Sequence, residues 1–302
     1  MRARPFTGFP EAFRALPAHA DAAYNVPEYD LAPAELRAVL LIAATPRVGS
    51  NLLGDGLRQT CLAGVPLEYL SFKLMPGGRD RSRRWHLPTP RLRDRARQAT
   101  RLVLRDPAWA TVDHSADRVA DYLRTVASFR TTPNGVFSLK AHWAHWEPHM
   151  VGSGLDADVW GVPVTWVSLD REDRLGQAIS FVRAKQSGAW RARVDHEVGA
   201  TFTPAYDAVA IRRALEAMEL GRQGWERYFA DQGIAPLRID YDEVVDDRDG
   251  VCRRILDAVD PTADHSWVPT GRTGVRRQAD SISDEWRARF VADGGGGALP
   301  GS

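Results

Sequence analysis

Residues 40–53 read LLIAATPRVGSNLL, and this stretch decides how the rest of the chain is interpreted. The apolar run at its start predicts a buried strand that ends at Thr45-Pro46. The chain then turns through Gly49 and resumes at Ser50-Asn51 with the apolar spacing of a helix. A strand, a short turn and a helix that packs back on the sheet are typical of an α/β fold.

The turn carries groups that can bind an anion. Backbone N–H groups in a tight turn and at a helix N-terminus point toward one centre. Arg47 adds a permanent positive charge, and Ser50 and Asn51 add side-chain donors. The Lys-Ser/Thr pair of a Walker A loop, whose hydroxyl holds magnesium, does not occur here. The turn therefore predicts a site for a phosphate ester without an obligatory metal. An ordinary helix start capped by Ser50 is the alternative.

Five motifs, spread in order over residues 40–290, together resemble the mycobacterial trehalose 2-sulfotransferase family. The first joins the turn to the segment ending at Glu68-Tyr69, in the pattern PRxGSxLL…AGxPxEY. The other four are 132–136 leading into Lys140, Arg171-x-Asp173 followed by 177–184, Gly224-Trp225, and 277–280 before 284–286. The resemblance implies a P-loop-like sulfotransferase fold, in which helices flank a central parallel sheet.

The resemblance also implies the donor 3′-phosphoadenylyl sulfate (PAPS), the product 3′-phosphoadenosine 5′-phosphate (PAP), and no metal, since Arg and Lys supply the charge. The residues expected to bind the donor around its 5′-phosphate are Thr45, Pro46, Arg47, Val48, Gly49, Ser50 and Asn51, with Arg47 at the leaving phosphate. Those expected at its 3′-phosphate are Arg171, Ser180, Arg276, Arg277 and Gln278. The family tends to carry Ser at the place of Gly176, so two hydroxyl positions stay open. A simple ion pair of Arg171 with Asp173 is the alternative role of that arginine.

Two side chains compete as the general base that would deprotonate an acceptor hydroxyl. Glu68 aligns with the glutamate that serves as base in the trehalose enzymes. A carboxylate suits this task if partial burial raises its pKa toward the operating pH. His142 ends a Lys-x-His pattern that resembles the base of eukaryotic cytosolic sulfotransferases, and an imidazole titrates near neutrality without tuning. His142 ranks second, as an acceptor-binding residue or a partner of Glu68, and Lys140 is expected near the transferred group.

The bulk composition excludes several classes of protein. The 302 residues carry a formal net charge of +1, so there is no general attraction to nucleic acid or membranes. The two cysteines, Cys61 and Cys252, make no disulfide framework, and no Cys/His spacing is typical of zinc. There is neither a signal-peptide core nor a membrane-length apolar run, which favours a cytoplasmic location. The ten tryptophans predict either core packing or an aromatic acceptor pocket.

Alternating elements predict one domain. Strands are expected at 38–44, 135–141, 162–169 and 237–239, and helices at 50–60, 116–127, 173–185, 206–231, 241–259 and 283–291. This order favours a parallel sheet with crossover helices. We expect an irregular N-terminal arm over 1–36 with at most a helical turn at 33–36, a single sulfotransferase domain over 37–292, and a flexible Gly-rich tail over 293–302.

The sequence thus predicts an enzyme that moves a sulfuryl group from PAPS to a hydroxyl of a sugar or a secondary metabolite. Residues 70–100 and 184–202 look least like the family and are the expected acceptor contacts. The resemblance makes a homodimer a possible assembly. A small-molecule kinase is one alternative, although the Walker lysine is missing. A non-catalytic nucleotide-binding protein is another, and it would tolerate loss of both Glu68 and His142.

Overall fold

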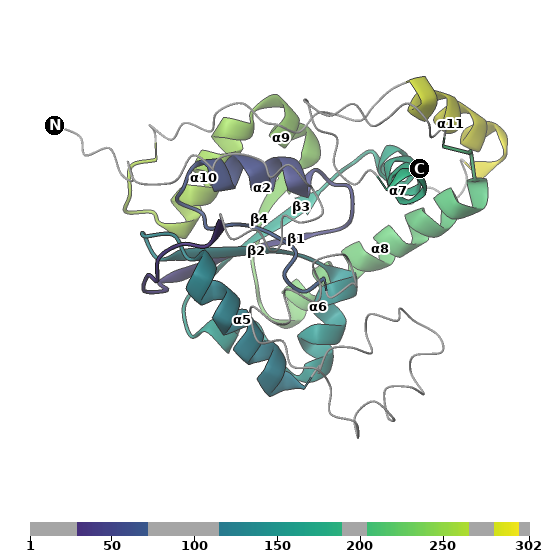
Figure 1. Ribbon diagram of the computed structural model, residues 1–302. Coiled ribbons are helices and arrows are strands. Elements are labelled where there is room, and N and C mark those ends of the chain that lie inside the picture. Colours follow the sequence, from purple (N-terminus) through teal and green to yellow (C-terminus); the bar gives the residue numbers. More distant parts are fainter. Residues whose placement is uncertain (1–28, 72–114, 189–203, 266–280, 296–302) are drawn as a thin grey trace.

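The computed structural model describes residues 29–71, 115–188, 204–265 and 281–295. In these residues the chain forms a four-stranded parallel sheet in the order β2-β1-β3-β4 (Figure 1). The strands are β1 (Ala38–Ala44), β2 (Val136–His142), β3 (Val164–Asp170) and β4 (Leu237–Asp240). The predicted α/β class with a central parallel sheet is therefore confirmed.

The central strand β1 is almost entirely buried. It pairs with β2 on one side and β3 on the other, and residues 39–44 are all buried. Val39, Leu41 and Ala43 pack into the hydrophobic cluster on one face, whereas Leu40 and Ile42 pack into the cluster on the other. A parallel strand covered on both faces reads as an unbroken apolar run, which explains why the sequence located it so closely.

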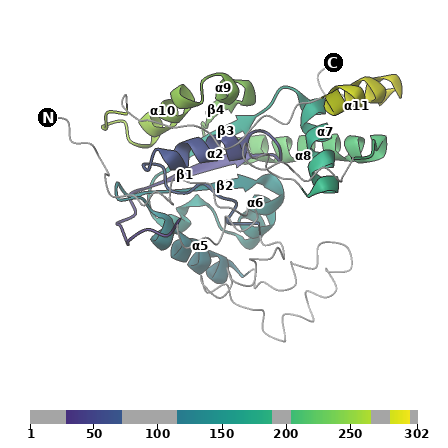
Figure 2. The same cartoon turned by 45° about the horizontal axis from the view of Figure 1, so that its top comes forward.

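Helices cover both faces of the sheet, as Figures 1 and 2 show. They are α2 (Ser50–Gln59), α5 (Ala116–Arg130), α6 (Trp143–His149), α7 (Arg174–Ser187), α8 (Ala208–Asp231), α9 (Tyr241–Asp246), α10 (Arg248–Val259) and α11 (Ser281–Ala292), with 3-10 turns at Val151–Ser153 and Ala157–Trp160. The apolar sides of α2, α9 and α10 pack on one face, and those of α5, α6 and α8 on the other. α7, the first half of α8 and α11 form a third apolar cluster. Within the described ranges, none of the helices has both the length and the apolar composition that crossing a membrane requires.

Local structure departs from the expectation in two places. The helix expected over 241–259 is two helices, because the Asp247 side chain accepts from the Gly250 amide at 2.8 Å and starts α10 anew. Residues 33–36 form no helical turn, which agrees with the expectation of at most one. The short helix α6 was not expected, since its Pro148 and its aromatic residues obscure the helical pattern.

The described end of the predicted arm lies against the domain. Tyr29 is buried, with the guanidinium groups of Arg58 and Arg130 over its ring at 5.1 and 5.6 Å. Arg130 also pairs with Asp30 at 3.0 Å. The domain limits at 37 and 292 stay a prediction. The tail beyond residue 295 lies outside the described residues.

The tryptophans that the structure describes serve mainly as core. Trp146, Trp160, Trp166, Trp225 and Trp286 are buried. The rings of Trp146, Trp166 and Trp225 contact one another at centroid distances of 5.5 to 6.3 Å. Trp143 packs edge-on against Trp225 at 5.3 Å. The core alternative therefore holds for this group, and the other four tryptophans lie outside the described residues.

Gly224 lets helix α8 pass close under the aromatic cluster. A Cβ atom at this position would lie 2.3 Å from the Trp143 ring, which is too close for any real contact. We expect Gly224→Ala to lower the free energy of unfolding by about 1–3 kcal/mol, the usual cost of overpacking a core. Urea unfolding followed by far-ultraviolet circular dichroism measures this change.

Gly221→Ala is the matched control, one turn earlier in the same helix. Its Cβ would lie 3.1 Å from a Thr45 methyl carbon, so a small shift can accommodate it. The gain in helix propensity, about 1 kcal/mol, offsets that strain. Equal stability of the two variants would contradict the role assigned to Gly224.

Candidate active site

The predicted site residues meet at the carboxyl-terminal edge of the sheet. The turn 45–49 follows β1, His142 ends β2, and Arg171 follows β3. In the register, Ile42 lies opposite Lys140 and Ala44 opposite both His142 and Leu169. Parallel strands bring their carboxyl ends to one edge, and open α/β sheets bind their ligands there.

The turn itself has an unusual backbone. Arg47 has φ 69° and Gly49 has φ 81°, so both lie in the left-handed region. Such a conformation costs a non-glycine residue on the order of 1–3 kcal/mol and is concentrated at functional sites. At Gly49, a Cβ atom would lie 2.5 Å from the Tyr241 ring, so glycine is also required for the close approach of α9. Packing of the Tyr241 ring from α9 against Gly49 therefore helps to hold the turn in this conformation.

Two side chains from distant helices brace the turn. Gln177 on α7 donates to Thr45 Oγ1 at 2.8 Å and to the Pro46 carbonyl at 2.6 Å. Trp225 on α8 donates its indole N–H to the Ala44 carbonyl at 3.1 Å. Thr45 therefore turns its hydroxyl toward α7, and Val48 is buried in the core. Gln177 and Trp225 were visible in the sequence only as parts of motifs.

On the β3 side of the turn, Arg47 lies near two other arginines and one hydroxyl. We call Arg47, Arg171 and Arg183 the arginine cluster. Arg47 Nε donates to Ser180 Oγ at 3.0 Å. Burial, together with the charges of Arg171 and Arg183, lowers the pKa of Arg47 to about 10, against a smaller opposing effect of Tyr241. The sequence assigned Arg47 to the 5′-phosphate and Arg171 with Ser180 to a separate pocket, whereas the structure brings Arg47 into contact with Ser180. Arg183 is an addition.

Neighbouring groups hold the other two guanidinium groups. Arg171 lies over the Tyr241 ring at 4.6 Å and pairs with Asp173 at 3.1 Å, so the predicted alternative contact of Arg171 is also present. Arg183 donates to Ser283 on α11. Burial alone would raise the pKa of Asp173. Hydrogen bonds from Arg287 and the Gly176 amide, with the charge of Arg171, nevertheless hold it below its usual range.

The structure distinguishes the two hydroxyl positions left open by the sequence. A Cβ atom on Gly176 would lie 2.0 Å from Asp173 Oδ2 and 2.7 Å from Arg287 Nη2. The space over Gly176 is therefore filled by the Asp173–Arg287 ion pair, whose N···O distance is 2.7 Å. Ser180 is the hydroxyl that contacts the arginine cluster.

On the β2 side of the turn, a second group surrounds Glu68. We call Glu68, Lys140, His142 and His145 the Glu68 cluster. Lys140 Nζ lies 3.2 Å from Glu68 Oε1 and donates to Asn51 Oδ1, which joins the cluster to the turn. His142 Nδ1 lies 3.8 Å from Glu68 Oε2. The His142 and His145 rings stack with centroids 5.6 Å apart.

A backbone bridge places Glu68 beside β2. Leu67 pairs with Leu139 in a parallel bridge, and the Lys140 amide donates to the Leu67 carbonyl at 3.0 Å. Tyr69 donates to the Val65 carbonyl at 2.8 Å, and Tyr122 donates to the Tyr69 carbonyl at 2.7 Å. No sequence pattern indicates this bridge, because a single pair of residues makes no strand.

A raised pKa was the condition under which Glu68 would suit the role of base, and the net pKa shift has the opposite direction. Burial by itself raises the pKa and is the largest single influence. The charges of His142, Lys140 and His145, with the hydrogen bond from Lys140, outweigh it and hold the pKa of Glu68 well below its usual range. Glu68 is therefore an ionised carboxylate at neutral pH, but its lowered pKa makes it a weaker base than a carboxylate whose pKa lies near the operating pH.

Sequence reasoning missed His145. It lies in the first turn of α6, three residues after His142, which ends β2 and precedes the helix, and the two rings stack. The signal was therefore present as His142-x-x-His145. The expected late basic residues Arg276, Arg277 and Gln278 lie outside the described residues.

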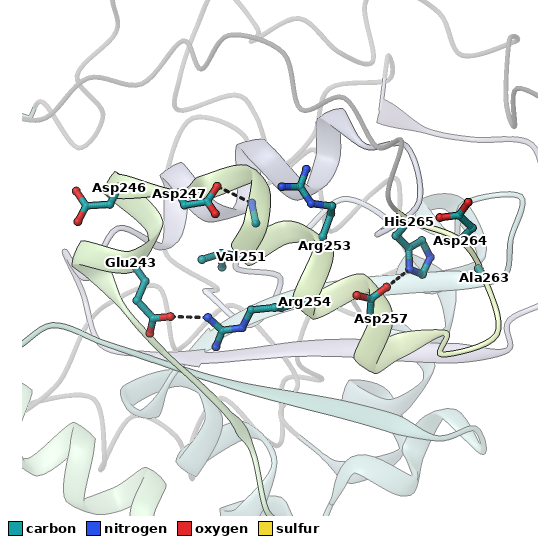
Figure 3. A pocket seen from close by; sticks show the side chains of 11 residues that line it. Glu243, Asp246, Asp247, Val251, Arg253, Arg254, Asp257, Ala263, Asp264 and His265 are labelled. Atoms are coloured by element: carbon teal, nitrogen blue, oxygen red, sulfur yellow. Dashed lines mark hydrogen bonds and ion pairs between the residues drawn. The ribbon is translucent and has the colours of Figure 1, made fainter.

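A separate surface groove of about 800 Å³ lies along α9 and α10 and contains none of the predicted site residues (Figure 3). Its charged side chains largely pair with one another. Arg254 contacts Glu243, and His265 Nδ1 lies 2.8 Å from Asp257. The two clusters beside the turn, rather than this groove, are the candidate active site.

Comparisons with known proteins show the family of this chain. The model of the family "Stf0 sulphotransferase" matches residues 39–293. A trehalose 2-sulfotransferase of Mycobacterium tuberculosis is 31% identical over 267 residues, covering 84% of this chain and 94% of the relative. One of Mycolicibacterium smegmatis is 30% identical over 274 residues, covering 86% and 97%.

Two solved structures are similar to this chain over most of its length, with low identity and low TM-scores. The sulfotransferase domain from the curacin biosynthetic pathway is 14% identical, with a TM-score of 0.40, over 85% of this chain and 99% of that one. Retinol dehydratase in complex with androsterone and inactive cofactor PAP is 12% identical, with a TM-score of 0.37, over 90% and 83%.

The lowered pKa of Glu68 predicts a pH-dependent contribution to stability. Because the folded chain binds this proton less tightly than the unfolded chain, the contribution is complete above the unfolded glutamate pKa of about 4.3. It is lost as the pH falls from there toward the folded value. We expect Glu68→Gln to remove up to about 1.4 kcal/mol per pH unit from the slope of unfolding free energy between about pH 3 and 4.3. Urea unfolding over pH 3–6 measures this slope.

Glu216→Gln, which removes an exposed carboxylate from α8, is the matched control. Glu68→Gln should also be less stable than wild type at neutral pH, because it leaves the buried Lys140 without its anionic partner. An unchanged pH slope in Glu68→Gln would show that the surrounding charges do not hold the carboxylate ionised.

Proposed function

Since the chain belongs to the Stf0 sulphotransferase family, we propose that it transfers a sulfuryl group from PAPS to a hydroxyl of a sugar or a secondary metabolite. Its curated relatives are named trehalose 2-sulfotransferase, so trehalose is the first acceptor to test. The donor supplies the sulfuryl group and a phosphate as leaving group. The chain's own residues bind the donor, orient the acceptor and neutralise the charge on the leaving phosphate.

The observation that carries this proposal is the arginine cluster around Ser180. Like charges held together in a poorly solvated place repel one another, and a bound anion relieves the repulsion. Burial and the charges of two neighbouring arginines already lower the pKa of Arg47. A nucleotide with phosphate groups at both the 3′ and 5′ positions supplies more than one negative charge and suits such a site.

Within this site we assign separate roles to the two sides of the turn. Arg171, Ser180 and Arg183 bind the 3′-phosphate, and Arg276, Arg277 and Gln278 complete the same pocket. The backbone amides of 47–51 with the Ser50 and Asn51 side chains bind the 5′-phosphate. Arg47 lies in the turn and contacts Ser180. It stabilises the charge that develops on the leaving phosphate, as in other transfer reactions dominated by electrostatics.

Glu68 acts as the general base on the acceptor side of the turn. Its carboxylate is ionised, and its Oε1 is held by Lys140 at 3.2 Å, which leaves Oε2 for a hydroxyl proton. Lys140 lies between Asn51 and Glu68, where its charge assists the transferred group. His142, 3.8 Å from Oε2, orients the acceptor or shares the proton. Arginine and lysine charges thus do the work that a metal does in many phosphoryl-transfer enzymes.

Calorimetric titration with PAP tests the donor site, with ADP as the control nucleotide. We expect micromolar binding of PAP and much weaker binding of ADP, because only PAP carries the 3′-phosphate that the cluster would bind. Equal binding of both, or no binding of PAP, would refute the donor. Transfer is then measured with PAPS and trehalose first, followed by other hydroxylated metabolites.

Arg47→Ala should weaken both PAP binding and turnover. Loss of a charge-assisted contact predicts a drop in PAP affinity of about tenfold or more. Arg213→Ala, which removes an exposed arginine from α8, is the matched control and should bind PAP like wild type. If Arg47→Ala binds PAP as tightly as wild type, Arg47 has no phosphate role.

Glu68→Gln should cut turnover by about 10²-fold or more while PAP binding persists, because general-base catalysis contributes on that scale. Glu216→Gln serves again as the control. The comparison with His142→Gln separates the two candidate bases. Turnover of Glu68→Gln within a few-fold of wild type, with His142→Gln inactive, would transfer the assignment to His142.

A further inference from the structure

We propose that Glu68, His142 and His145 bind a divalent transition-metal ion such as Zn²⁺, and that the bound metal switches the enzyme off. The metal site stands on the geometry of these three side chains. Its inhibitory effect rests on the proposed function, because it follows from the role of Glu68 as base. This metal would be an inhibitor, distinct from any requirement of the transfer reaction.

The three side chains form a ligand set of two imidazoles and one carboxylate. One ligand atom from each lies within 4.8 Å of the other two, and His142 Nδ1 is 3.8 Å from Glu68 Oε2. Zinc binds nitrogen and oxygen ligands at about 2.0–2.2 Å, so ligands of one ion lie roughly 3.3 Å apart. Side-chain rotations that bring these atoms together by about 1.5 Å or less would close the site.

The fold holds the ligands on rigid elements. The Leu67–Leu139 bridge fixes the backbone before Glu68, His142 is the last residue of β2, and His145 lies in the first turn of α6. The stacked rings of His142 and His145 already face in similar directions, with an angle of 28° between their planes. A metal site gains affinity when its ligands need little reorganisation.

Lys140 is the main positive charge that would repel a bound metal ion, and its position limits this repulsion. Its ammonium lies on Oε1 and is also bound to Asn51 Oδ1, whereas His142 approaches the other oxygen, Oε2. A donor on the second oxygen of a ligating carboxylate is the usual outer-shell arrangement in metal sites. The repulsion by Lys140 favours a reversible site over a permanent structural one.

The ligand types select the class of metal. Imidazole nitrogen suits Zn²⁺, Ni²⁺, Co²⁺ and Cu²⁺, whereas Mg²⁺ and Ca²⁺ prefer oxygen ligands. Three protein ligands leave a position for water, as in open zinc sites. Glu68 and His142 side chains are 16% and 11% exposed, so an ion can reach them from solvent. A metal ion bound to Glu68 Oε2 would block the oxygen that takes the proton from the acceptor hydroxyl.

The test uses the full chain after treatment with a chelator. Isothermal titration with ZnCl₂ should show one ion per chain at micromolar affinity, and MgCl₂ should show no binding. Co²⁺ should give the visible absorption of a site with nitrogen ligands. His145→Phe keeps a ring against His142 but removes both nitrogens, and it should weaken Zn²⁺ binding at least tenfold.

His265→Phe is the matched control, because it removes one imidazole from the α10 groove. It should bind Zn²⁺ like wild type. Thermal unfolding checks that both variants fold, and His145→Ala replaces His145→Phe if the phenyl ring destabilises the chain. Wild-type protein that does not bind Zn²⁺, or a His145 variant that binds it as tightly as wild type, would overturn the site.

Activity measurements separate this proposal from the proposed function. With PAPS and an accepted acceptor, Zn²⁺ should lower turnover of wild type, and excess chelator should restore it. Zn²⁺ that binds through His145 without lowering turnover would overturn the inhibition alone. PAP binding by the arginine cluster does not involve Glu68, His142 or His145. A failure of zinc binding therefore leaves the proposed donor site unaffected.

Discussion

The hydrogen-bonded pairing of β1 between β2 and β3 is the constraint on which the site depends. Because β1 lies between β2 and β3, the turn that follows it can contact groups from both neighbouring strands. Arg47 reaches Ser180 on α7 after β3, and Asn51 accepts from Lys140 on β2. If the register shifted by one residue, alternate side chains would exchange faces and Lys140 would leave the edge.

The turn separates two environments of different charge. On the β3 side, guanidinium groups gather with one hydroxyl, and this side suits phosphate. On the β2 side, one carboxylate lies among cationic and imidazole groups, and this side suits proton transfer or a metal ion. Lys140 links the sides through Asn51, so occupancy of one can influence the other through a short chain of contacts.

Most of the site could be predicted, and the omissions have a physical cause. The turn, Glu68, Lys140, His142, Arg171 and Ser180 could be named because each lies in a motif with a fixed spacing or follows a strand end. His145, Gln177 and Arg183 were missed because their roles come from contacts across the fold, such as the bonds of Gln177 to the turn. The direction of the Glu68 pKa was also missed, since it depends on which charges surround the carboxylate.

The sequence by itself determined the class of fold, the order of its strands and helices, and the family. Buried parallel strands leave unbroken apolar runs, and a binding turn needs particular residues in a row, so both are written locally. Only the tertiary structure decided that α6 is a helix, that the 241–259 segment breaks at Asp247, and that Glu68 stands against Lys140, His142 and His145. The contacts of Glu68 depend on distances between residues far apart in the chain, which a linear pattern does not contain, whereas the break at Asp247 is a local bond to Gly250 that the apolar spacing does not show.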